Sequence, residues 1–178
     1  MIAAAGAVLS RCLREVERVR AEAARTGWTP ELAAQALVPF RLAGAIALAR
    51  PVAQEPARDG APLRDGQLAV RHGLLGRKQL FVSAAITGDA IGRLRRESNG
   101  ARPPQVSPQV LDAIRDVLVG LNAARYGRNG ADGADLDRML DEGRDALRRL
   151  RAATRWPARA AGLAAQAVGA VRGSAWRR

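Results

Sequence analysis

The chain has 178 residues, of which 48% are apolar and 3% aromatic, and a formal net charge of +12. This length suits one compact domain, and the scarcity of aromatic residues favours close-packed helices over a sheet sandwich. The single cysteine, Cys12, excludes an internal disulfide framework and a multi-cysteine zinc site, and no uncharged apolar run reaches the roughly 20 residues that a membrane-spanning helix needs.

Two helices are predicted at the start of the chain. Apolar residues recur at spacings of three and four from about residue 3 to residue 25, with charged residues between them, which is the pattern of an amphipathic helix. Thr29, Pro30 and Glu31 then provide a cap, a first-turn proline and a first-turn acid for a second helix. That helix extends to about Leu48, and Pro39 is expected to kink or split it.

A loop and a β-hairpin are predicted next. Residues 51–66 contain three prolines, two glycines and charges of both signs, so we expect an exposed, flexible loop there. Between residues 67 and 86, two alternating apolar and polar runs flank a glycine-containing turn, which predicts a hairpin. His72 lies in this hairpin and is the only histidine, which excludes a multi-histidine metal site.

Three further helices are predicted in the second half. Thr87 is expected to cap a short helix to about residue 97, and Ser107-Pro108 opens another to about residue 125. A last helix is expected over about 134–153, antiparallel to its predecessor. The predicted fold is therefore mainly α: a helical domain at 1–153 with one β-hairpin and a C-terminal helical hairpin, followed by a basic amphipathic tail at 154–178.

Positive charge is concentrated at the C-terminal end. Residues 144–178 carry nine arginines and one acid, whereas the other 143 residues carry 20 basic and 16 acidic side chains. If this segment is helical, five of these arginines lie within a sector of about 80° on the helix surface, away from the apolar positions, and form a ridge: Arg144, Arg148, Arg151, Arg155 and Arg159. The predicted anionic-surface residues are Arg144, Arg148, Arg151, Arg155, Arg159, Arg172, Arg177 and Arg178.

Two interpretations of these arginines stay open. Guanidinium groups bind phosphate oxygens in pairs, so this ridge of arginines suits nucleic acid or lipid headgroups. Alternatively, the arginines complement the negative end of their helix and pair with Asp141 and Asp145, which lie three or four residues upstream of Arg144, Arg148 and Arg149.

The tail beyond this ridge has the composition of an interfacial helix. Residues 160–171 are apolar except for Gln166, and Trp156 and Trp176 flank them as predicted interfacial anchors. Twelve residues of helix span about 18 Å, which is too short for a bilayer core of about 30 Å. The alternatives are a helix that docks on the body of the protein and a frayed terminus.

No catalytic or metal-binding motif is present. The acids Asp132, Asp135, Asp137 and Asp141 lack the spacing of a calcium loop and are better explained as acids at a helix start. The stretch GLLGRK at 73–78 does not match a phosphate-binding loop, and there is no Gly-x-Ser-x-Gly elbow. We therefore expect no enzymatic activity, no cofactor and no metal.

One stretch resembles known proteins. Residues 123–150 are similar to the tail of bacterial envelope-associated proteins of unknown function, in which Arg-Tyr-Gly, here Arg125, Tyr126 and Gly127, separates two helices. This resemblance implies a membrane-linked and non-catalytic part.

The sequence predicts a non-enzymatic interaction or scaffolding module. Its cationic tail would contact an anionic membrane surface or an acidic protein partner, in a cytoplasmic protein peripheral to the inner membrane. One alternative is a nucleic-acid-binding protein that uses the Arg144–Arg159 ridge. A second is a subunit of a homo-oligomer or larger assembly that docks through its tail.

Overall fold

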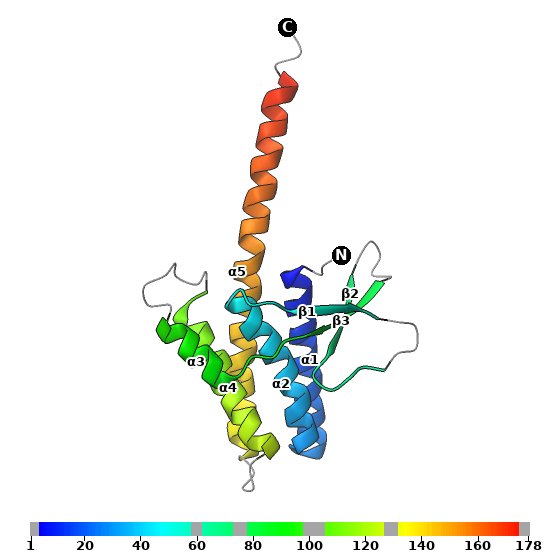
Figure 1. Cartoon of the computed structure of the whole chain (residues 1–178), viewed down its shortest axis with the longest axis vertical. Helices are drawn as coiled ribbons and strands as arrows, with labels where there is room; N and C mark the ends of the chain where they lie inside the picture. Colours follow the sequence, from blue (N-terminus) through cyan, green and yellow to red (C-terminus); the bar gives the residue numbers. More distant parts are fainter. Residues whose placement is uncertain (1–3, 58–61, 73–77, 98–105, 127–131, 175–178) are drawn as a thin grey trace.

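The computed structural model describes residues 4–57, 62–72, 78–97, 106–126 and 132–174, with the side chains of 155–174 left out. Four helices form a bundle: α1 (Ala5–Thr26), α2 (Pro30–Ala47), α4 (Pro108–Tyr126) and α5 (Gly133–Ser174). Neighbouring helices run in opposite directions, and α1 closes the bundle against α5 (Figure 1). The helix α3 (Gly88–Glu97) packs on α4. The mainly helical prediction is confirmed.

The predicted caps explain where two of the helices begin. The Thr29 hydroxyl accepts a hydrogen bond from the Leu32 amide at 3.2 Å, and the Thr87 hydroxyl accepts one from the Ala90 amide at the same distance. Pro39 is buried inside an unbroken α2, so the predicted split does not occur. Packing of α2 between α1 and α4 outweighs the loss of one backbone hydrogen bond there.

A three-stranded antiparallel sheet lies beside α1 and α2. The predicted hairpin is confirmed as β2 (Leu68–His72) paired with β3 (Lys78–Ser83). The third strand, β1 (Ala53–Pro56), pairs with the other edge of β3, so the expected loop over 51–66 is wrong at these four residues. Pro56 is compatible with this place because β1 is an edge strand. The Arg11 Nε donates to the Ala69 carbonyl at 3.0 Å, which joins β2 to α1.

The helix α5 is much longer than predicted. The sequence pattern indicated an end near residue 153, but α5 continues without a break through Pro157 to Ser174. Figure 1 shows its last part, in orange and red, leaving the bundle at the end where α1 begins. The proposed domain boundary at 153/154 thus lies inside one helix. Among the described helices, none combines the length and apolarity that crossing a membrane requires.

Candidate anionic-surface site

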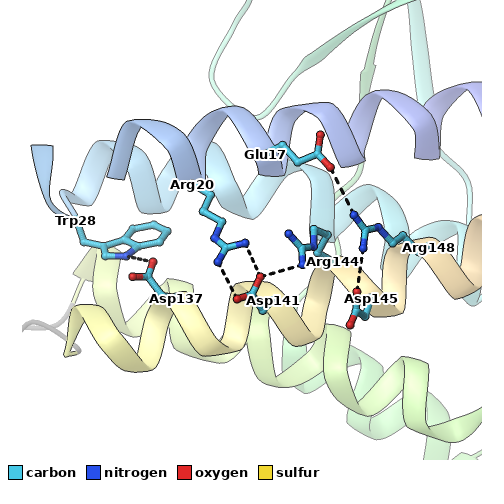
Figure 2. A network of polar contacts seen from close by, with 8 residues as sticks. All are labelled: Glu17, Arg20, Trp28, Asp137, Asp141, Arg144, Asp145 and Arg148. Carbon is cyan, nitrogen blue, oxygen red and sulfur yellow. Dashed lines mark hydrogen bonds and ion pairs between the residues drawn. The ribbon is translucent and has the colours of Figure 1, made fainter. Parts of the chain in front are cut away.

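Polar side chains line the seam between α1 and α5, which Figure 2 shows from close by. Trp28, just after α1, donates its indole N–H to Asp137 at 3.1 Å. Asp141 then receives both terminal nitrogens of Arg20, Nη1 at 2.6 Å and Nη2 at 2.9 Å. One of these contacts, from Nη2, is a hydrogen bond and the other is an ion pair, and together they join α5 to α1 at this level.

Two arginines of the predicted ridge belong to the same seam. Arg144 lies 3.2 Å from the Asp141 carboxylate, and Arg148 lies 3.4 Å from Asp145 and 3.8 Å from Glu17 of α1. The pairs Asp141–Arg144 and Asp145–Arg148 are two that the sequence spacing offered. We call the contacts from Trp28–Asp137 to Glu17–Arg148 the ion-pair ladder. Within the ladder, acids therefore pair with two of the five arginines of the ridge.

The ladder ends at Arg148, and all charged residues that follow along α5 are arginines. No acid occurs after Asp145, whereas eight arginines lie between residues 146 and 178. Arg149 is exposed. The buried Nε of Arg151 has no hydrogen-bond partner among the described residues. The part of the sequence that has arginines but no acids therefore begins near the point where α5 leaves the bundle.

The remaining predicted site residues lie farther along the chain. Arg155, Trp156, Arg159 and Arg172 occupy positions on the projecting part of α5, and their side chains are not described. Trp176, Arg177 and Arg178 lie outside the described residues. Their roles in binding stay predictions.

The acids at the start of α5 have structural roles. The Asp132 carboxylate accepts from the Ala134 amide at 3.2 Å, and Asp135 pairs with Arg138 at 2.9 Å. Asp137 and Asp141 belong to the ladder. In the described part of the chain, no three potential metal-ligating side chains come together.

Two further polar groups on α1 are buried and serve packing. Desolvation by burial raises the pKa of the Cys12 thiol from 9.0 to about 12, so this thiol stays protonated and unreactive at neutral pH. Glu15 is buried between Arg11 at 3.0 Å and Arg18 at 2.6 Å. The hydrogen bond from Arg18 to Glu15 raises the pKa of the guanidinium. His72 lies on β2, but its side chain is not described.

Sequence reasoning missed the contribution of α1 to the seam. Glu17 and Arg20 alternate with other charged residues on an amphipathic helix, and any of these could face solvent. Only the packing of α5 against α1 selects these two as ladder partners.

Comparison with known proteins gives no relative. No protein-family model matches the chain, and neither a curated protein nor a solved structure is significantly similar to it. The resemblance of residues 123–150 to bacterial envelope-associated proteins stays a prediction. In the structure, the Arg125 guanidinium lies over the Tyr126 ring at 5.0 Å from its centroid and pairs with Asp65 at 3.2 Å.

Replacing Asp141 by asparagine should destabilise the bundle through the ladder. The variant leaves Arg20 and Arg144 facing each other without a carboxylate, and we expect the free energy of unfolding to fall by about 1–2 kcal/mol in urea titrations at low salt. Asp145→Asn is the matched control, since it removes one contact of 3.4 Å between half-exposed groups, which is worth about 0–0.5 kcal/mol. Equal losses in both variants would show that the contacts of Asp141 with Arg20 and Arg144 stabilise the bundle no more than the Asp145–Arg148 contact does.

Proposed function

We propose that this chain is a non-enzymatic interaction module that binds an anionic surface, first of all the cytoplasmic face of a membrane, through the C-terminal part of α5. The observation that carries the proposal is the end of the ion-pair ladder at Arg148, beyond which α5 continues past the bundle with arginines and no acids. Uncompensated guanidinium groups on a projecting helix are accessible to a large anionic partner.

The composition of the projecting segment favours a membrane over nucleic acid. A helix without tertiary contacts is marginal in water, and twenty residues of it, 155–174, extend about 30 Å. Its apolar stretch at 160–171, with a tryptophan on either side in the sequence, suits the boundary between headgroups and acyl chains. Nucleic acid would use the arginines but not this apolar stretch.

The proposal is tested by vesicle co-sedimentation of the full-length chain and a triple variant, Arg155→Gln/Arg159→Gln/Arg172→Gln. Because each arginine near an anionic bilayer contributes about 1 kcal/mol, we expect partitioning onto phosphatidylglycerol-containing vesicles to fall about 100-fold in this variant. The matched control is Arg64→Gln/Arg93→Gln/Arg96→Gln, which removes the same charge from exposed positions before β2 and on α3. It should bind as the unmodified chain does.

Two results would contradict the membrane assignment. Equal losses in both triple variants would mean that net charge alone drives binding, without a site on α5. Tight binding to mixed-sequence DNA that falls steeply with salt, with no partitioning onto vesicles, would favour the nucleic-acid alternative. Replacing Trp156 and Trp176 by alanine separates the two cases, because only membrane binding should weaken.

A further inference from the structure

The membrane-contacting surface need not begin on the projecting helix. The register of the seam brings α1 next to the part of α5 from which the projecting segment continues. The helices α1 and α5 run antiparallel, and Glu17 meets Arg148. One turn from Glu17 toward the start of α1 is Arg14, and one turn from Arg148 toward the end of α5 is Arg151. Both steps lead in the same direction along the seam, so Arg14 and Arg151 lie at the same level.

These positions differ from the rest of the seam in their charge balance. Arg14 is exposed, and neither it nor Arg151 forms an ion pair with a described acid. The Arg148 side chain is 54% exposed, and its contacts to acids, at 3.4 and 3.8 Å, are longer than the 2.6 Å contact of Arg20. Of these three arginines, only Arg148 contacts described acids, Glu17 and Asp145, whereas Arg20 at the other end of the seam lies 2.6 Å from Asp141.

We infer that the anionic-surface site extends onto α1, where Arg14 joins Arg148 and Arg151 to bind the phosphate groups of anionic lipids. The inference rests on the proposed function. Guanidinium forks bind phosphate oxygens bidentately, and the long contacts of Arg148 leave its donors accessible to such an exchange. The junction between the bundle and the projecting part of α5 would then lie against the headgroups, and the opposite end, with Trp28 and Asp137, would point away.

The first test is the double variant Arg14→Gln/Arg151→Gln in the full-length chain. Each arginine near an anionic bilayer increases partitioning by about fivefold. Partitioning of the double variant onto phosphatidylglycerol-containing vesicles should therefore fall about 25-fold. The control Arg64→Gln/Arg93→Gln removes the same charge from exposed positions elsewhere and should change partitioning by less than about twofold. Unchanged urea unfolding of the double variant excludes loss of fold as the cause.

The second test reads out orientation with an environment-sensitive dye on an introduced cysteine. The buried Cys12 should take up no dye, so labelling is confined to the new thiol. Ala5→Cys and Ala24→Cys place the dye on exposed positions at opposite ends of α1. Anionic vesicles should shift the emission of the dye to shorter wavelength at position 5 and leave it unchanged at position 24.

The outcomes separate this inference from the proposed function. If the unmodified chain does not bind anionic vesicles, both fail together. If the α5 triple variant loses binding while Arg14→Gln/Arg151→Gln retains it, only the extension onto α1 is overturned. Equal dye shifts at positions 5 and 24, or a shift at 24 alone, would also overturn it.

Discussion

A Gly143→Ala variant should unfold with a free energy about 1–2 kcal/mol lower than that of the unmodified chain. Gly143 of α5 faces Phe40 of α2 and Val117 of α4. A Cβ atom there would be 2.6 Å from Phe40 Cε1 and 2.7 Å from Val117 Cγ2. Alanine within a helix is favoured over glycine by about 1 kcal/mol, but overpacking a core costs about 1–3 kcal/mol. Phe40 is fully buried, and side chains in a close-packed interior move aside only at a cost, so overpacking should dominate.

Two further variants, also measured by urea unfolding, test whether contact with Phe40 causes the loss of stability in Gly143→Ala. At Gly120, a Cβ would be 2.5 Å from Met139 Cε, the far end of a flexible side chain that can move aside. Gly120→Ala should therefore be neutral or stabilising by up to about 1 kcal/mol. In a Phe40→Leu background, which removes the ring atoms nearest to Gly143, the cost of Gly143→Ala should shrink. An unchanged cost in that background would contradict the assigned contact.

Stability should decrease steeply above pH 9 because of Cys12. Burial raises the pKa of this thiol from 9.0 to about 12. Between these values the unfolded chain releases the thiol proton and the folded chain keeps it, so each pH unit favours unfolding by about 1.4 kcal/mol. Stabilisation by the protonated thiol is fully present below pH 9 and is lost as the pH rises toward 12.

The measurement compares urea unfolding of the unmodified chain and Cys12→Ala at pH 8 and pH 11. The unmodified chain should lose about 2–3 kcal/mol more than the variant over this interval. Contributions from the other ionisable groups are common to both proteins and cancel in the comparison. Parallel losses would show that the thiol ionises as easily in the folded chain as in the unfolded one. Native Cys12 should also resist alkylation at pH 8 until the chain unfolds.

Local pattern was sufficient for most helices and for the hairpin. Helix starts follow from side chains that satisfy free backbone amides, as Thr29 and Thr87 do, and such caps depend on neighbours only three residues away. The alternation on either side of the turn at 73–77 likewise predicted the pairing of β2 with β3.

Strand β1 and the length of α5 were not predictable in this way. Ala53–Pro56 has no alternation and contains a proline, and it becomes a strand because β3 offers a free edge. The apolar face of α5 is clear up to about residue 153, where contact with the bundle ends. Periodicity reports the face that a helix buries, so it gives no signal where the helix has nothing to pack against.

The sequence by itself determined the charge of the candidate site: eight arginines and no acid after Asp145 follow from composition alone. It also offered the pairs Asp141–Arg144 and Asp145–Arg148, because residues three apart on a helix are neighbours. The contribution of Arg20 and Glu17 of α1 to the ladder is visible only once the helices are packed together. The physical reason is that contacts between helices depend on their register and direction, which are set by packing of the whole core rather than by either segment.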